Sequence, residues 1–382
     1  MMKPHNISFQ TLLACVPVQP PFAVDWKTIW SLWPEMPALD TCPQDPIHHA
    51  EGDVGLHTRM VTEALITLPE WQALEPPARN ILFWAAVLHD IGKPATTKQE
   101  PDGRISARGH ARIGTLMARK LLWECGAPFE WREAVCGIIS EHLVPFWLIE
   151  RESALRLSIQ TSWKCRPDYL CLHSKADALG RICEDGQGVL DNIDLAEQSF
   201  RDVGCWDKRF DFANAASRVS FFEKDGRDPY YEEYEDFRCK VTFMSGLPGS
   251  GKDTWIKTYA PDQPVISLDT IRAEIGAASS GNQGQVIQAA RERAREYLRA
   301  GQDFVWNATN ITRQMRQKSI SLARDYNAQT RIVYIEVPPA RLSGQNSNRQ
   351  AVVPAAAIEK MTRKLEPPQA WECHDLTLVI GE

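Results

Sequence analysis

The sequence predicts a protein of two domains, an N-terminal all-α bundle and a C-terminal α/β domain with a parallel sheet. Three observations lead to this expectation. The chain has 382 residues, which is enough for two or three domains of about 100–200 residues each. Apolar residues recur at helical spacing in its first half and in short β-rich runs in its last third. A phosphate-loop pattern begins only at Gly246.

The first domain is expected to span residues 1–236, with a helical core at about 47–183 and a helical and linker extension at 184–236. Several stretches place apolar residues three and four positions apart, as one helix face requires: HTRMVTEALITL, ARNILFWAAVLHDIG, HARIGTLMARKLLWECG and WREAVCGIISEHLVPFWL. One more helical stretch lies near Leu190–Phe200, and a charged, tyrosine-rich run follows it. This half therefore predicts a helical bundle.

The second domain is expected to span residues 237–382. Short β-rich runs alternate there with helical stretches: KVTFMS, PVISL, DFVWNA, TRIVYIEV and LTLVI. Such alternation predicts a parallel sheet covered by helices. The phosphate-loop pattern follows the first run and opens a helix, which is the context that the motif requires.

Composition excludes several classes of protein. Hydrophobic residues make up 43% and charged residues 24% of the chain, and no apolar run approaches the ~18 residues of a membrane span. We expect no signal peptide and no membrane partner. The 10 cysteines have irregular spacing without a C-x-x-C pair, so we expect a reducing, cytoplasmic location. A net charge of −6 disfavours binding along long nucleic acid, whereas a short nucleic-acid end stays open.

Histidine and aspartate recur in short motifs across the first domain. A lone His89–Asp90 pair on an apolar helix would be explained as a hydrogen-bonded core pair, but this pair does not stand alone. Imidazoles and carboxylates without cysteine suit Mn²⁺, Fe²⁺, Co²⁺ or Ni²⁺ better than structural zinc. The candidate ligands are His49, His57, His89, Asp90, His110, His142 and Asp177.

We expect these residues to hold two metal ions. The first would be held by His57, His89, Asp90 and Asp177. Asp90 would bridge to a second ion held by His110 and His142, and a bound water would become hydroxide near neutral pH and attack phosphorus. Lys93 and Arg181 are candidate partners for phosphate oxygens, with solvated surface cations as the alternative.

These motifs resemble a known family. HHAEGDVGLHTRMV, LHDIGKP, DGRISARGHARIG, EHLVPF and ADALGR are similar to the HD phosphohydrolase superfamily, and to the HD domain of bacterial tRNA nucleotidyltransferases in particular, over residues 47–182. The resemblance implies hydrolysis of 2′,3′-cyclic phosphates and of 2′- or 3′-phosphomonoesters of RNA. Whether His49 is a ligand or supports one stays open.

The phosphate loop predicts binding of ATP or another nucleoside triphosphate. Its backbone N–H groups and the following helix N-terminus suit phosphates, and Lys252 would bridge the outer pair. Asp253 stands where the pattern has a magnesium-binding hydroxyl, so Mg²⁺ would be held by Asp253 itself, through water, or by Thr254. The candidate nucleotide-binding residues are Gly246, Gly249, Ser250, Gly251, Lys252, Asp253, Thr254 and Arg349.

The stretch SLDTIRAEIG places Asp269 and Arg272 at a helix start beside the carboxyl edge of the predicted sheet, where ligands of open α/β sheets bind. Asp269 is a candidate base for an attacking hydroxyl, and Arg272 a candidate contact for a neighbouring phosphate. The alternative is an N-cap aspartate with a solvated arginine.

The motifs GLPGSGKDT, DTIR, NATN and QNSNRQAVVP resemble the phage-type polynucleotide kinases over Lys240–Trp371. The resemblance implies that Asp269 is the general base on a 5′-hydroxyl, that Arg272 contacts the adjacent 3′-phosphate, and that Arg349 reaches ATP from a lid. Three residues depart from the family pattern: Asp253 replaces the loop hydroxyl, Asn307 an acidic residue and Gln345 a lid arginine. Further along, Arg313 and Arg316 are candidate phosphate contacts, with a solvated helix face as the alternative.

Together the halves resemble the bacterial HD-polynucleotide kinase family. The resemblance implies that one domain clears phosphates from one RNA end while the other phosphorylates the opposite 5′-hydroxyl, with DNA ends as an alternative substrate. A separate RNA ligase would join the products. Two other hypotheses remain: an HD nucleotidase fused to a nucleoside-type kinase, or an HD phosphohydrolase regulated by a nucleotide-sensing domain. DTIR disfavours the sensor, because a sensor needs no hydroxyl-directed base.

Overall fold

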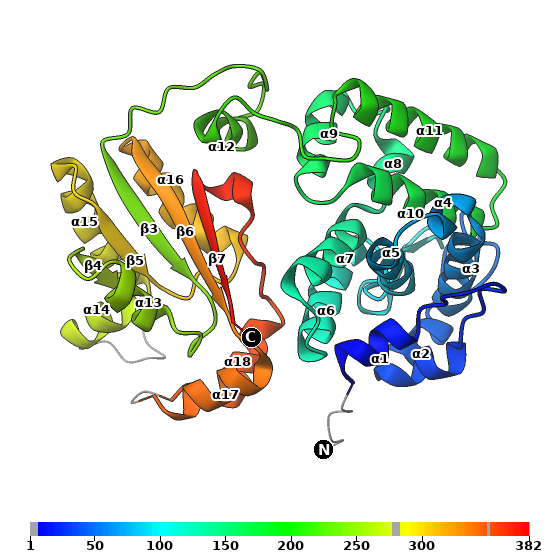
Figure 1. Cartoon of the computed structure of the whole chain (residues 1–382), viewed down its shortest axis with the longest axis horizontal. Helices are drawn as coiled ribbons and strands as arrows, with labels where there is room; N and C mark the ends of the chain where they lie inside the picture. The colour runs from blue at the N-terminus through cyan, green and yellow to red at the C-terminus, as the bar shows by residue number, and fades with distance from the viewer. Residues whose placement is uncertain (1–6, 277–282, 350–351, 382) are drawn as a thin grey trace. The chain divides into compact units, whose positions relative to one another are not determined.

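The computed structural model describes residues 7–276, 283–349 and 352–381 (Figure 1). The chain forms two compact units, Met1–Asp211 and Phe212–Glu382. Within the described ranges, no helix has both the length and the apolarity needed to cross a bilayer.

Over its described residues, 7–211, the first unit is helical apart from one short antiparallel hairpin, β1 (Lys98–Gln99) and β2 (Ile105–Ser106). Its helices are α1 (Phe9–Ala14), α2 (Trp26–Leu32), η1 (Met36–Thr41), α3 (Val54–Thr67), α4 (Pro69–Gln72), α5 (Pro76–Leu88), η2 (Lys93–Ala95), α6 (His110–Glu124), α7 (Phe129–Glu141), α8 (Val144–Trp147), α9 (Ala154–Ser162), α10 (Pro167–Leu179) and α11 (Gly186–Asp202). This architecture confirms the predicted helical bundle.

Helix α5 is central to the first unit. Every side chain from Leu82 to Leu88 is fully buried, and a helix that is apolar on all sides belongs inside a core. Helices α3 and α7 pack against it. The helix ends at Leu88, one residue before the expected His-Asp pair, so His89 caps the helix and Asp90 lies just beyond it. The pair therefore sits at the end of a rigid, buried element.

The second unit is a parallel sheet with helices around it, as predicted. The strands are β3 (Cys239–Ser245), β4 (Val265–Ser267), β5 (Phe304–Asn307), β6 (Ala328–Glu336) and β7 (Asp375–Ile380), in the spatial order β4-β5-β3-β6-β7. The helices are α12 (Ala215–Glu223), α13 (Lys252–Tyr259), α14 (Leu268–Glu274), α15 (Gln283–Ala300), α16 (Arg313–Asp325), α17 (Pro339–Ser347), α18 (Ala355–Thr362) and η3 (Ala370–Glu372).

Strand β3 lies in the middle of the sheet and explains where the phosphate loop sits. Its neighbours are β5 on one side and β6 on the other, so the sheet grows in both directions from β3. Such a reversal of strand order creates a crevice outside the carboxyl ends of the strands. Ser267 of β4 pairs in register with Asn307 of β5. The loop after β3, the start of α14 and the end of β5 therefore share one sheet edge.

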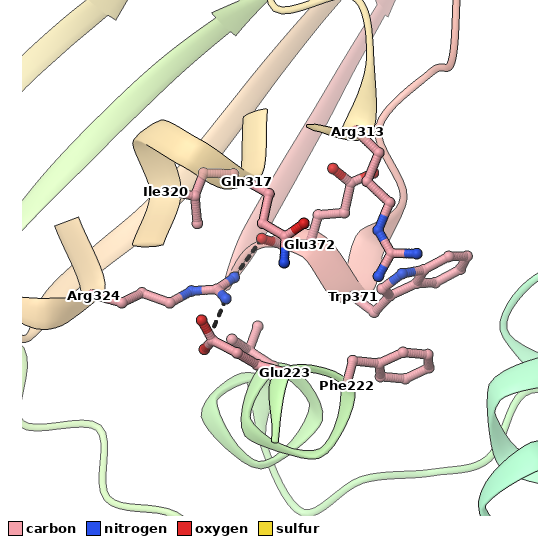
Figure 2. A pocket seen from close by; sticks show the side chains of 9 residues that line it. Phe222, Glu223, Arg313, Gln317, Ile320, Arg324, Trp371 and Glu372 are labelled. Carbon is pink, nitrogen blue, oxygen red and sulfur yellow. Dashed lines mark hydrogen bonds and ion pairs between the residues drawn. The ribbon is translucent and has the colours of Figure 1, made fainter. Parts of the chain in front are cut away.

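We expected the boundary between the units near residue 236, but it lies earlier, after Asp211. Helix α12 belongs to the second unit. Phe222 stacks on Trp371 with 5.1 Å between ring centroids, and Glu223 forms an ion pair with Arg324 at 2.9 Å (Figure 2). The charged, tyrosine-rich run after α12 is thus an irregular segment of the second unit rather than a linker.

Candidate active sites

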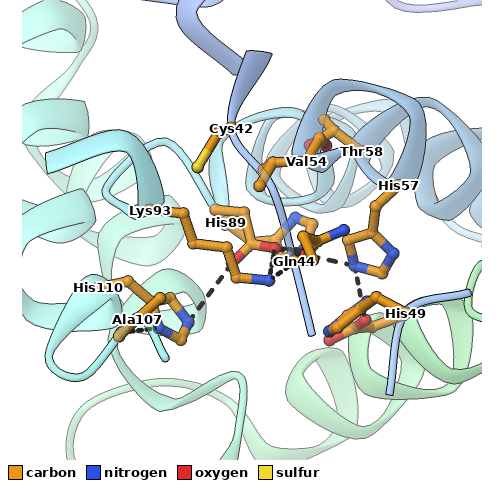
Figure 3. A network of polar contacts seen from close by, with 12 residues as sticks. Cys42, Gln44, His49, Val54, His57, Thr58, His89, Lys93, Ala107 and His110 are labelled. Atoms are coloured by element: carbon orange, nitrogen blue, oxygen red, sulfur yellow. Dashed lines mark hydrogen bonds and ion pairs between the residues drawn. The ribbon is translucent and has the colours of Figure 1, made fainter. Parts of the chain in front are cut away.

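The first unit brings its seven predicted ligands into one continuous group, shown in part in Figure 3. Helix ends supply most of them. His57 lies in the first turn of α3, His110 is the first residue of α6, and His142 directly follows α7. Asp177 comes from the last turn of α10, and His49 from the turn before α3. Six of the seven are buried, and His49 is half-buried.

Asp90 stands between two sets of imidazoles. Its Oδ2 lies 3.2 Å from Nε2 of His89 and 3.8 Å from Nε2 of His57. Its Oδ1 lies 3.4 Å from Nε2 of His110 and 4.0 Å from Nε2 of His142. The two carboxylate oxygens thus face different sets, which is the arrangement expected of a carboxylate that bridges two metal ions.

Backbone carbonyls fix the tautomers of three histidines. Nδ1 of His89, His110 and His142 each lies 2.8 Å from the carbonyl oxygen of the residue three positions earlier. A carbonyl only accepts, so Nδ1 carries the proton and a neutral ring presents a lone pair on Nε2. Nε2 of His110 and of His142 are 3.2 Å apart.

Two facing lone pairs at that distance repel unless a proton or a cation lies between them. Burial lowers the pKa of His142 well below its usual value, and burial also lowers that of His110. Protonation near neutral pH is therefore disfavoured, and a divalent cation fits the donor atoms instead. Groups of histidine and carboxylate atoms close enough to share an ion occur on both sides of Asp90. This is a buried His/Asp metal-binding cluster.

Sequence reasoning missed Glu51, which supports the cluster. Its Oε1 lies 2.8 Å from Nδ1 of both His49 and His57, and its Oε2 accepts the backbone N–H of Ile182 at 2.9 Å. Burial alone would raise the pKa of Glu51, but the bonds from His49 and His57 hold it well below the usual value. An ionised Glu51 thus turns Nε2 of His57 toward Asp177, 3.2 Å away. The signal was a glutamate placed between two candidate histidines in HHAEGDVGLH.

His173 was also missed. It is fully buried on α10, with its ring centroid 5.3 Å from that of His89. Burial lowers its pKa to about 3, so it is neutral. The available signal was its spacing of one helical turn before Asp177 in HSKAD.

Both predicted phosphate-binding cations lie in the cluster rather than on the solvated surface. Nζ of Lys93 lies 2.7 Å from Oδ2 of Asp90 and donates to Oε1 of Gln44 at 2.7 Å. Arg181 pairs with Asp177 at 3.1 Å, and its guanidinium lies 5.1 Å from the ring centroid of Phe146. The solvated alternative is therefore excluded for both, while their contact with phosphate stays a prediction.

The phosphate loop of the second unit has the backbone that its glycines require. Gly246, Gly249 and Gly251 have φ angles of 143°, 83° and 105°, a region that favours glycine. A Cβ on Gly246 would lie 2.4 Å from the carbonyl oxygen of Ile335. The loop therefore packs tightly against β6 and then opens α13.

Lys252 folds back on this loop. Its Nζ donates to the carbonyl oxygens of Gly246 and Leu247, each at 2.9 Å. Burial lowers its pKa to about 8, and Asp253, Arg349 and Asp269 are close enough to act on the same group. Three of the predicted kinase residues therefore lie near one ammonium group at one sheet edge.

Asp269 is not the N-cap of α14. Ser267 holds that position, and its Oγ accepts the backbone N–H of Thr270 at 3.3 Å. The side chain of Asp269 is 78% exposed and pairs with Arg272 at 2.5 Å. The N-cap alternative is therefore wrong, and the carboxylate is free of a capping duty.

The three departures from the family pattern each have a contact. Oδ1 of Asp253 accepts from Nδ2 of Asn307 at 2.8 Å. Gln345, with its amide oriented to suit both partners, donates to the carbonyl oxygen of Gly249 at 2.6 Å and accepts from Arg341 at 3.2 Å. Gln345, which stands where the family pattern has a lid arginine, thus links α17 to the phosphate loop by a hydrogen bond.

The prediction that Arg316 contacts phosphate is wrong, and so is its solvated alternative. Arg316 is fully buried and bonded to both carboxylate oxygens of Glu372, at 2.7 and 2.8 Å. Its Nη1 also donates to the carbonyl oxygens of Asn310 and Glu366, at 3.0 and 2.8 Å. It therefore fixes the NATN turn that follows β5. Arg313 is exposed, and its role stays a prediction.

Comparison with known proteins agrees with this division. The HD domain family matches residues 54–179, and the AAA domain family AAA_33 matches residues 241–368. The chain is 33% identical over 111 residues to the multifunctional CCA protein of Psychromonas ingrahamii, covering 29% of this chain and 24% of that one. It is 35% identical over 134 residues to the multifunctional CCA protein of Methylococcus capsulatus, covering 35% and 28%.

A third relative is the A-adding tRNA nucleotidyltransferase of Deinococcus radiodurans, 29% identical over 140 residues, covering 36% of this chain and 30% of that one. The chain thus covers only 24–30% of the length of these relatives. A sugar kinase structure from Janibacter sp. HTCC2649 matches with a TM-score of 0.29 and 17% identity over 37% of this chain and 84% of that one. The chain joins an N-terminal helical HD domain to a C-terminal parallel-sheet, P-loop kinase-like domain.

Proposed function

We propose that the chain heals broken RNA ends with two separate activities. The HD domain hydrolyses 2′,3′-cyclic phosphates and 2′- or 3′-phosphates, and the P-loop domain transfers the γ-phosphate of ATP to a 5′-hydroxyl. The observation that carries the proposal is Asp269, an exposed carboxylate without a capping duty at the sheet edge that holds Lys252. A nucleotide sensor has no use for such a group.

In the HD domain, divalent transition metals would supply Lewis acidity and a bound water acidified toward neutral pH. The residues that would hold them are Asp90 and the six other predicted ligands around it. Glu51 keeps His57 oriented, and the backbone carbonyls keep His89, His110 and His142 in the Nδ1–H tautomer. Lys93 and Arg181 would neutralise the phosphate oxygens of the substrate, because both lie beside the carboxylates of the cluster.

In the kinase domain, Asp269 would accept the proton of the 5′-hydroxyl as its oxygen attacks the γ-phosphorus of ATP. The bond between the γ-phosphorus and the β,γ-bridging oxygen breaks, and ADP leaves with Mg²⁺. Lys252 would exchange its bonds to Gly246 and Leu247 for the β- and γ-phosphates. Arg272, beside Asp269, would hold the phosphate next to the 5′-hydroxyl, and Arg349 would reach the ATP phosphates.

RNA is the favoured substrate because one relative of the chain is named a tRNA nucleotidyltransferase. A separate ligase would then consume a 5′-phosphate and a 3′-hydroxyl, which are the products of the two activities.

The test is incubation of the full chain with γ-labelled ATP and Mg²⁺ in the presence of 5′-hydroxyl RNA, 5′-hydroxyl DNA or free nucleosides. We expect label on the 5′ end of RNA oligonucleotides. Label on nucleosides alone would instead support the nucleoside-type kinase. ATP binding without transfer to any acceptor would support the sensor. The matched control is Lys257→Ala, which removes an exposed lysine of α13 outside the phosphate loop.

A further inference from the structure

We propose that Asp253 and Asn307 are a reciprocal exchange that preserves a magnesium site. In P-loop enzymes generally, a loop hydroxyl and an acidic residue from a strand end hold Mg²⁺. In this chain the acidic residue, Asp253, occupies the hydroxyl position of the phosphate-loop motif, and the neutral amide Asn307 occupies the strand end. The inference rests on the proposed function, because it assigns the metal of the same ATP complex.

The topology brings the two residues together. Asp253 is the second residue of α13, which opens directly from the phosphate loop. Asn307 is the last residue of β5, the strand hydrogen-bonded to β3. Nδ2 of Asn307 donates to Oδ1 of Asp253 at 2.8 Å. The two departures from the usual pattern are therefore partners.

The exchange conserves charge and ligand type. A hydroxyl with a carboxylate carries one negative charge, and so does a carboxylate with an amide. The bond between the pair uses the amide nitrogen and one carboxylate oxygen, so the amide oxygen and the other carboxylate oxygen are left for a cation or its waters. Oxygen donors of this kind are those that Mg²⁺ prefers.

The pairing also distinguishes this role from two simpler ones. An aspartate in a first helical turn is favoured by the helix dipole alone, but such a residue needs no amide partner from another strand. Thr254 could supply a hydroxyl, but Thr254 would leave the charge of Asp253 and the identity of Asn307 unexplained. If Asn307 were an aspartate, two carboxylates would meet at hydrogen-bond distance and repel, so an aspartate at position 307 suits a neutral residue at position 253.

The experiment is a double-mutant cycle with Asp253→Ser, Asn307→Asp and the two combined, using the full chain. The readout is the gain in ATP affinity that Mg²⁺ produces, measured by calorimetry with and without Mg²⁺. We expect Asp253→Ser to reduce that gain by roughly 10- to 100-fold, because no carboxylate is then left at the site, and the double substitution to restore most of it. Nucleotide-free unfolding temperatures should not change, because Asp253 is exposed and Asn307 only half-buried.

Three results would overturn the proposal. The first is that Asp253→Ser alone keeps the full magnesium gain. The second is that the double variant shows no more gain than Asp253→Ser alone. The third is that Thr254→Val abolishes the gain while Asp253→Ser does not. The readout is independent of transfer to a 5′-hydroxyl. A protein that binds Mg²⁺ and ATP but phosphorylates no RNA would contradict the proposed function and leave the cycle readable.

Discussion

The two candidate active sites differ most in how deeply their acidic groups are buried. The side chain of Asp90 in the HD cluster is 2% exposed, whereas that of Asp269 at the kinase edge is 78% exposed. A site that holds metal with its own side chains must fix every donor before the metal arrives, and burial in a helical bundle does so. A kinase site receives Mg²⁺ together with the phosphates, so its acids can stay open to solvent.

The sites also differ in what their cations contact. Lys93 is paired with Asp90 and Gln44, and Arg181 with Asp177, so both are already placed beside the metal-binding groups. Lys252 instead bonds to carbonyls of its own loop and must leave them to reach a phosphate. Under the proposed function, the HD site is preorganised, whereas Lys252 of the kinase site would rearrange when nucleotide binds.

The largest expected effect separates the two sites by their metals. Protein stripped of metal and given Mg²⁺ alone should lose phosphohydrolysis to background, because an imidazole-rich cluster suits transition metals. The same sample should still phosphorylate 5′ ends. Assays of both activities before and after adding Mn²⁺, Co²⁺, Ni²⁺ or Fe²⁺ test this. Full hydrolysis with Mg²⁺ alone would contradict the comparison.

The second prediction concerns the exposed acid. Asp269→Asn should lower 5′-phosphorylation by at least ~10²-fold, because an amide cannot accept the proton of the attacking hydroxyl. Since Ser267 caps α14, the unfolding temperature and ATP affinity should be unchanged. Steady-state rates and thermal unfolding measure these quantities. A rate near that of the wild type would assign the base to another residue.

The third prediction concerns the buried support of the HD cluster. Glu51→Gln removes the charge that orients His49 and His57, and we expect metal affinity to fall by roughly 10- to 100-fold. Glu70→Gln is the matched control, because Glu70 forms an ion pair with Lys175 at the surface, outside the cluster. Competitive metal titration compares the two variants. An equal loss in both would show that Glu51 has no special role.

The smallest expected effect is a pH dependence of the kinase site. Burial lowers the pKa of Lys252 from 10.5 to about 8, so this lysine is charged below that pH and neutral above it. Phosphates favour the charged form. ATP affinity should therefore fall as pH rises through about 8, and binding just above that pH should take up a proton. Calorimetry in two buffers of different ionisation enthalpy measures the uptake, and a buffer-independent heat would contradict the assignment.

Local patterns were enough to predict the two fold classes, because the helical spacing and the β-rich runs are properties of short segments. Contacts between distant segments were not visible in them. Phe222 of α12 stacks on Trp371, and this contact joins α12 to the second unit. No local sequence pattern near residue 222 predicts that contact. Arg316 stands on a helix with the spacing of a solvated face, yet Glu372 holds it in the core.

The candidate sites show the same difference between local motifs, which the sequence reveals, and contacts between residues, which need the fold. Motif spacing predicted the histidines around Asp90, because each belongs to a short signature. Glu51 and His173 support these residues from nearby positions: Glu51 lies within HHAEGDVGLHTRMV without being singled out there, and His173 lies just before ADALGR. Asp253 and Asn307 were recognised as separate departures, and only the fold shows that they are bonded to each other.

Two independent sites that act on opposite ends of RNA are central to the proposed function. The most direct measurement uses an RNA with a 5′-hydroxyl and a 2′,3′-cyclic phosphate, treated with Asp90→Ala or Lys252→Ala protein and ATP. Asp90→Ala should yield a 5′-phosphate and an intact cyclic end, Lys252→Ala should yield the opposite product, and a mixture of both variants should heal both ends. Loss of both activities in either variant, with its fold retained in thermal unfolding, would contradict the account.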